Sequence, residues 1–137
     1  MVTKPWFLAF LLAGGVVMLG ACGSDDNEAS PSTPATGGVD PSELPGAEVY
    51  AQSCAECHGA DLRGTDKGPS HLSIVYEPGH HSDDSFRNAI ANGVGAHHWE
   101  FGDMDPVPGL SVGDVDAIIE YVRAVQAREG FEPYPPE

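Results

Sequence analysis

The sequence predicts a small all-α fold, and three observations support this class. Apolar residues recur every three to four positions in three separate segments, which is the spacing of one face of a helix. No stretch alternates apolar and polar residues as a strand would. The third observation is the run Cys54-Ala55-Glu56-Cys57-His58, which brings two thiols and an imidazole together at a helical turn.

A first helix is expected from Gly46 to about Cys57, because Val49, Tyr50 and Cys54 fall on one face. Residues 59–69 follow as a loop rich in Gly, Asp and Thr. Such residues favour turns over regular structure.

A middle helix is predicted near 82–92. Ser82 is placed to cap it, acidic residues follow in its first turn, and Asn92-Gly93 ends it. Phe86 and Ile90 lie on its apolar side.

The final helix has the clearest pattern and runs to about Arg128. Ser111 and Asp114 resemble a capping box with Asp in the usual Glu position. One face then repeats apolar residues at helical spacing: Val115, Ile118, Ile119, Val122 and Val125. The remaining residues, 129–137, contain three prolines and are predicted to be an irregular tail.

The N-terminal segment, residues 1–21, is predicted to be a lipoprotein signal peptide. Lys4 precedes an apolar run over 6–19, which is shorter than the roughly 20 residues that a bilayer core needs. The ending Leu19-Gly20-Ala21-Cys22 resembles a bacterial lipobox, in which the cysteine receives a diacylglycerol. We therefore expect a lipid-anchored protein on the extracytoplasmic side of the cell membrane; an ordinary cleaved signal or an uncleaved anchor are the alternatives.

Residues 22–45 are predicted to be a flexible tether after the lipidated Cys22. The composition there shifts to Ser, Asp, Pro, Thr, Gly and Ala, with too little apolar surface to offset the entropy of ordering. A flexible chain of this length would hold the domain at 46–128 about 25 Å from the membrane.

Charge excludes one class of partner. All 21 acidic residues follow Cys22, and without Lys4 the mature chain has five basic side chains and a formal charge of −16. Nucleic acid is therefore not an expected partner, because its phosphates would repel this surface. The acidity favours either solubility or electrostatic steering toward a basic partner.

The Cys54–His58 run matches the attachment motif of haem c. Cys54 and Cys57 can each form a thioether with one vinyl group of the porphyrin, and His58 can then ligate the iron. The three cysteines divide into one for lipid and two for haem, so a disulfide framework is not expected. Two alternatives are a thiol–disulfide catalyst, which lacks its usual βαβ surroundings, and a zinc module.

On these motifs the chain resembles the class I monohaem cytochromes c over roughly 46–126. The resemblance implies that the N- and C-terminal helices cross around a covalently bound haem. Gly46 would let the two helix backbones approach closely, and Tyr50 and Tyr121 would fill the sides of the crossing. It also implies that the carbonyl of Pro69 accepts a hydrogen bond from the ring N–H of His58 and so orients this iron ligand.

Met104 is the predicted sixth iron ligand. It is the only methionine of the mature chain, and it lies in a Gly- and Pro-rich loop before the last helix, where the family places its methionine. A neutral thioether suits haem iron and favours the ferrous state. The alternatives are a ligand from the pair His97-His98, an open site, or a methionine that only fills the core.

We therefore predict an electron carrier without substrate chemistry, anchored in the membrane by its lipid. The alternative is a haem-containing redox enzyme or sensor with a displaceable sixth ligand. Glu100, Asp103 and Asp105 flank Met104 and predict an acidic docking face. Its expected partners are redox proteins with a basic patch, such as an oxidase, a quinol-oxidising complex or a dehydrogenase.

Overall fold

All regular structure in residues 38–135, the part of the chain that the computed structural model describes, is helical. In chain order the elements are the 3₁₀ helix η1 (Pro41–Glu43), α1 (Pro45–Ser53), α2 (Ala55–His58), the 3₁₀ helix η2 (Ile74–Tyr76), α3 (Asp83–Asn92) and α4 (Val112–Glu129). Across these residues the only β pairing consists of two isolated bridges, Ser73 with Glu132 and Val94 with Met104. The predicted all-α class is confirmed.

The predicted signal peptide (1–21), the lipidation site Cys22 and most of the predicted tether (22–45) lie outside the described residues. The last residues of the tether segment do contact the domain. Pro41 is buried, and an Asp40 carboxylate oxygen lies 3.0 Å from Nη1 of Arg128 at the end of α4. Between residues 38 and 135, no helix has both the length and the apolar character needed to cross a membrane.

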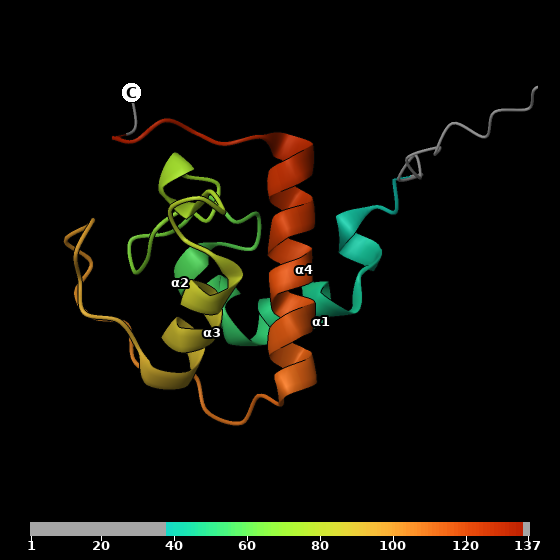
Figure 1. Cartoon of the computed structure of the whole chain (residues 1–137), viewed down its shortest axis with the longest axis horizontal. Coiled ribbons are helices and arrows are strands. Elements are labelled where there is room, and N and C mark those ends of the chain that lie inside the picture. The colour runs from blue at the N-terminus through green and yellow to red at the C-terminus, as the bar shows by residue number, and fades with distance from the viewer. Residues whose placement is uncertain (1–37, 136–137) are drawn as a thin grey trace, which may run out of the picture. The chain divides into compact units, whose positions relative to one another are not determined.

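The central packing contact is the crossing of α1 and α4 (Figure 1). Gly46 lies at this crossing. A Cβ added to it would lie 1.9 Å from the backbone oxygen of Ala117 and 2.9 Å from Cβ of Tyr121, so only glycine fits. Beside this contact the rings of Tyr50 and Tyr121 pack with their centroids 5.3 Å apart, as the family resemblance implies.

The predicted single helix from Gly46 to Cys57 is two helices in the structure. The break falls at Cys54, whose φ of −125° and ψ of −35° depart from helical values. Backbone hydrogen bonds continue across it, because the Cys54 N–H donates to Tyr50 and the His58 N–H donates to Cys54. The helical spacing of the sequence survives this distortion, so the pattern alone did not reveal it.

The two later helices agree closely with their predicted ranges. At α4 the predicted capping box is present: Ser111 Oγ accepts from the Asp114 N–H at 3.2 Å, and Asp114 Oδ2 accepts from the Ser111 N–H at 2.9 Å. At α3, Ser82 occupies the N-cap position but its hydroxyl bonds the Ser85 hydroxyl instead of a backbone N–H. The buried core joins these helices and their connections: Tyr50, Leu62, Leu72, Phe86, Ile118, Ile119, Tyr121, Val122 and Val125.

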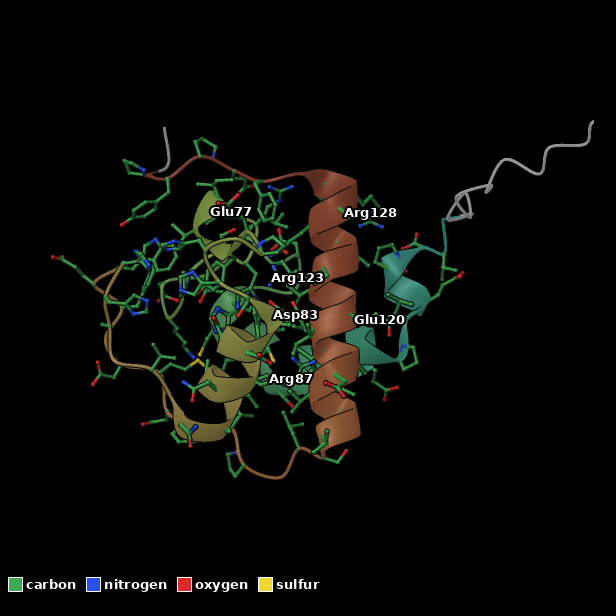
Figure 2. The ribbon with its side chains drawn as sticks, in the orientation of Figure 1. Glu77, Asp83, Arg87, Glu120, Arg123 and Arg128 are labelled. Atoms are coloured by element: carbon green, nitrogen blue, oxygen red, sulfur yellow. The ribbon has the colours of Figure 1, made fainter. Side chains whose placement is uncertain are left out.

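Arg123 connects α4 to the segment before α3. Figure 2 shows its side chain extending from α4 toward Asp83, whose carboxylate lies 2.8 Å from Arg123 Nε. The same guanidinium donates to the carbonyls of Tyr76 at 2.7 Å and His81 at 2.6 Å, and it stacks on the Phe86 ring at 5.0 Å. With Gln126 Oε1 at 2.8 Å from Nη1, this largely buried cation has four acceptors, and its bonds to Tyr76, His81 and Asp83 fix the turn at 77–81.

We predict that Gly46→Ala destabilises the haem-loaded protein by about 1–3 kcal/mol, the usual cost of overpacking. The added methyl group would meet backbone atoms of α4, which cannot rotate away. Chemical denaturation followed by circular dichroism measures this loss.

Gly113→Ala is the matched control. Gly113 lies in the first turn of α4 with only Ser111 Oγ, at 3.7 Å, near an added Cβ. Its expected effect is neutral to a gain of up to about 1 kcal/mol from helix propensity. Equal stability of the two variants would contradict the close helix crossing.

Candidate haem site

A cavity of about 810 Å³ lies between α2, α3 and the loop that leads to α4. This volume falls within the range of small-molecule and cofactor sites. All of the sequence-predicted haem-binding and iron-ligating residues line it: Cys54, Cys57, His58, Pro69 and Met104. The fold therefore brings together residues that are up to 50 positions apart in the chain.

His58 is oriented by the loop that follows it. Its Nδ1 lies 3.0 Å from the carbonyl oxygen of Pro69, and because a carbonyl only accepts, Nδ1 carries the proton. The side chain is buried, and burial lowers the pKa of His58 below its ordinary value despite the opposing effect of the Pro69 carbonyl. The ring is thus neutral, with the lone pair on Nε2, which is the form that binds iron.

The thiols of Cys54 and Cys57 come from the same short stretch of chain as His58. Cys54 is half-buried and Cys57 is exposed, and both line the cavity. Burial raises the pKa of the Cys54 thiol to about 11, with a smaller contribution from Cys57. The Cys57 carbonyl accepts from Thr65 Oγ1 at 2.7 Å, which holds the loop against the attachment motif.

Tyr50 ties the helix crossing to this motif. Its hydroxyl, fully buried, donates to the carbonyl of Gly59 at 3.1 Å, directly after His58. Because α4 holds Tyr50 in place, a residue of the interhelical contact also positions the turn that carries the iron ligand.

Met104 also lines the cavity, and the two ends of its loop are tied together. It forms a two-way backbone bridge with Val94, at 2.8 and 2.9 Å, and Ala96 N–H donates to Asp103 Oδ1 at 2.8 Å. Gly93, with φ of +74°, starts this loop; a Cβ there would lie 2.4 Å from the Met104 carbonyl oxygen. The bridge fixes the backbone of the predicted sixth ligand.

Aromatic residues form the edge of the cavity. Trp99 and Phe101 both line it, and Trp99 stacks on Tyr76 with ring centroids 5.6 Å apart. Arg63 and Arg87 do not line it. Each pairs with surface carboxylates, Arg63 with Glu129 and Glu132, and Arg87 with Asp84 and Asp116.

His71 is a residue of the site that the sequence did not single out. Its ring stacks on His58, with centroids 4.0 Å apart and planes 18° apart. Burial, followed by the charges of His58 and Arg123, places the pKa of His71 well below its ordinary value. A lone histidine in an irregular segment gives no periodic signal, so only the fold reveals this neutral ring beside the ligand.

The residues present fit a haem c. Two thiols, a neutral imidazole and a thioether line one cavity of suitable size, and the imidazole already has its orienting carbonyl. These features define the class of small all-α proteins that bind haem c through a Cys-x-x-Cys-His motif.

Comparison with known proteins agrees. The family model described as Cytochrome c matches residues 44–126, and the chain belongs to this family. It is similar to cytochrome c-551 of Bacillus subtilis (strain 168), with 38% identity over 79 residues. The matched region is 58% of this chain and 66% of that relative, so the chain spans just under two thirds of the relative's length. No solved structure matches the chain significantly.

Family membership confirms the prediction of one covalent haem c attached through the Cys54–Cys57 motif. The cytochrome c family consists of haem-based electron carriers. This supports the prediction of an electron carrier over the alternative of a haem-containing enzyme.

Proposed function

We propose that this chain is a membrane-anchored monohaem cytochrome c that carries single electrons between redox proteins. The observation that carries the proposal is the shared cavity, which is lined by Cys54, Cys57 and His58 and by Met104. Haem, when bound, supplies reversible Fe(III)/Fe(II) chemistry.

The protein side chains have separate tasks in this proposal. Cys54 and Cys57 hold the group covalently, and His58 ligates the iron through Nε2. Pro69 orients His58, which the 3.0 Å Nδ1–carbonyl distance supports. Met104 supplies the sixth ligand, and its backbone bridge to Val94 supports a fixed position in both oxidation states.

Met104→Ala is expected to remove the near-infrared sulfur–iron band of the oxidised, haem-loaded protein and to lower its reduction potential. The reason is that a neutral thioether stabilises the ferrous state. Visible and near-infrared spectra, with a redox titration, measure both effects.

His97→Ala and His98→Ala are the controls, because both histidines also line the cavity. Each is expected to retain the sulfur–iron band. If the band persists in Met104→Ala, or is absent from the parent, the assignment of Met104 is wrong. Rapid binding of carbon monoxide by the reduced parent would favour the alternative of a displaceable sixth ligand.

An acidic face is proposed as the docking surface. Glu100, Asp103 and Asp105 are exposed, and Asp103 and Asp105 line the cavity that Met104 enters. Every basic side chain in residues 38–135 lies in an ion pair with an acidic one. This pairing leaves the negative charge of the loop unbalanced and supports a basic patch on the partner, whether oxidase, quinol-oxidising complex or dehydrogenase.

Inorganic probes of opposite charge test this face. Electron exchange with cationic hexaammineruthenium should slow as ionic strength rises, and exchange with anionic ferricyanide should accelerate, because salt screens the charges of the loop. Neutralising Glu100, Asp103 and Asp105 to their amides should slow the cationic reaction at low salt by about tenfold.

The control neutralises three exposed carboxylates that do not line the cavity: Glu43, Glu48 and Glu120. An equal loss in this control would show that net charge, rather than the loop, steers the encounter.

We also propose that a lipid on Cys22 holds the domain at the extracytoplasmic membrane surface. Cys22 would follow a signal peptide over 1–21 and begin a tether over 22–45. The lipobox sequence Leu19-Gly20-Ala21-Cys22 supports it. Mass spectrometry of the mature N-terminus should find a diacylglyceryl group on Cys22 in the parent and in the control Ser24→Ala, and none in Cys22→Ser. A parent chain without lipid would refute the anchor.

A further inference from the structure

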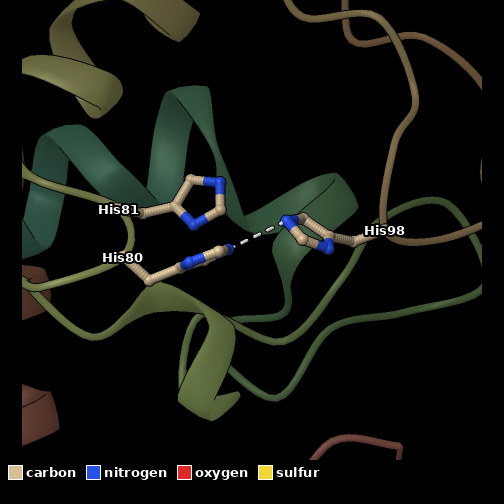
Figure 3. Close-up of side chains that lie close together, drawn as sticks. All are labelled: His80, His81 and His98. Carbon is tan, nitrogen blue, oxygen red and sulfur yellow. Dashed lines mark hydrogen bonds between the residues drawn. The ribbon is translucent and has the colours of Figure 1, made fainter.

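Four histidines without a role in the proposed haem attachment and iron ligation gather at the cavity, and three of them, His81, His97 and His98, line it. His80 and His81 lie in the turn that precedes α3, and His97 and His98 lie in the loop that follows it. The ligand atoms of His80, His81 and His98 all lie within 4.8 Å of one another (Figure 3). His98 is 17 and 18 positions from His81 and His80 in sequence, and the fold brings the three imidazole rings close together.

The spacing of these nitrogens suits a shared metal ion. Nε2 of His80 and Nε2 of His98 are 3.2 Å apart. Two imidazole nitrogens at about 2.0–2.1 Å from a tetrahedral Zn²⁺ lie about 3.3–3.4 Å from each other. The His80–His98 pair therefore needs little movement to accept such an ion.

His81 has the orientation of a metal ligand. Its Nδ1 lies 2.6 Å from the Val75 carbonyl oxygen, so Nδ1 carries the proton and the lone pair of the neutral ring is on Nε2. His97 has the same arrangement with the Gly95 carbonyl at 2.9 Å. A carbonyl that fixes the tautomer of an imidazole is the usual outer contact of a metal-binding histidine.

The backbone around the cluster is held from both sides. Arg123 donates to the carbonyl of His81 at 2.6 Å and to that of Tyr76 at 2.7 Å, which fixes the turn. The hydroxyl of Tyr134 donates to the carbonyl of His98, which ties the loop to the C-terminal segment. The cluster is therefore built on anchored backbone, which reduces the entropy cost of binding an ion.

We propose that His80, His81 and His98 form a second metal site, for a divalent transition-metal ion of the Zn²⁺ or Cu²⁺ class. Imidazole nitrogen suits these ions, and the strongly negative chain attracts cations. The fourth position is open to water or to His97, whose ring centroid lies 4.4 Å from that of His98. This site is distinct from the proposed iron ligands, His58 and Met104.

An ion at this site would act on the haem through charge. His81 and His98 belong to the cavity wall, so the ion would place positive charge at the edge of the haem pocket. Positive charge there stabilises the more reduced iron, and the reduction potential would rise when the ion binds.

The test titrates the haem-loaded mature chain with Zn²⁺, and separately with Cu²⁺, in calorimetry and equilibrium dialysis. Because both thiols of the attachment motif are occupied by haem, they do not compete for the added ion. We expect one ion per chain in addition to iron. His80→Ala and His98→Ala should each weaken binding by about 100-fold, because each removes one of three ligands.

Glu77→Gln is the matched control. Glu77, labelled in Figure 2, is exposed in the same turn, and its substitution removes a negative charge but no ligand nitrogen. Binding should remain within about twofold of the parent. If Glu77→Gln weakens binding as much as the histidine variants, general attraction of cations explains the result and the site is refuted.

Two further readouts separate this site from the haem ligation. Zn²⁺ should raise the reduction potential of the parent and leave that of His80→Ala unchanged; tight binding without a shift would overturn the placement at the cavity edge. The sulfur–iron band should persist in His98→Ala. If the band is lost, or if His98 ligates the iron, His98 does not belong to the metal site. If only the result expected for Met104→Ala is not observed, the proposed sixth ligand is wrong and the metal site is unaffected.

Discussion

The close crossing of α1 and α4 at Gly46 is the constraint on which the rest of the structure depends. Because no side chain separates the two backbones there, Tyr50 is buried against α4 and its hydroxyl reaches the carbonyl of Gly59. That bond fixes the turn carrying His58, and the following loop then brings the Pro69 carbonyl to its Nδ1. The orientation of the proposed iron ligand thus derives from a backbone contact between helices.

The two sides of the cavity are held in different ways. The attachment side is a short helical segment supported by the core, with His71 and Tyr50 buried behind it. The side with Met104 is a loop tied at its ends by the Val94 bridge. Covalent attachment suits the first side, while the second side needs only to hold one soft ligand in a defined place.

The basic side chains and the acidic loop beside Met104 have different roles. Across residues 38–135 the basic side chains are used in ion pairs that connect helices and loops, and Arg123 also fixes the turn at 77–81. Exposed pairs of this kind contribute little stability each. Their main consequence is that each lysine and arginine in residues 38–135 has a carboxylate partner, which leaves the charge of the loop with Glu100, Asp103 and Asp105 unbalanced.

The sequence by itself determined the fold class, the ranges of the later helices, the capping box at Ser111 and the haem attachment motif, because each rests on local spacing. It also named Pro69 and Met104, because the loop after the motif and the loop before the last helix resemble those of the family. Only the tertiary structure decided the break at Cys54, the burial of His71 against His58, and the meeting of His80, His81 and His98. These features depend on contacts between distant segments and on how α1 packs against α4, for which hydrophobic periodicity carries no information.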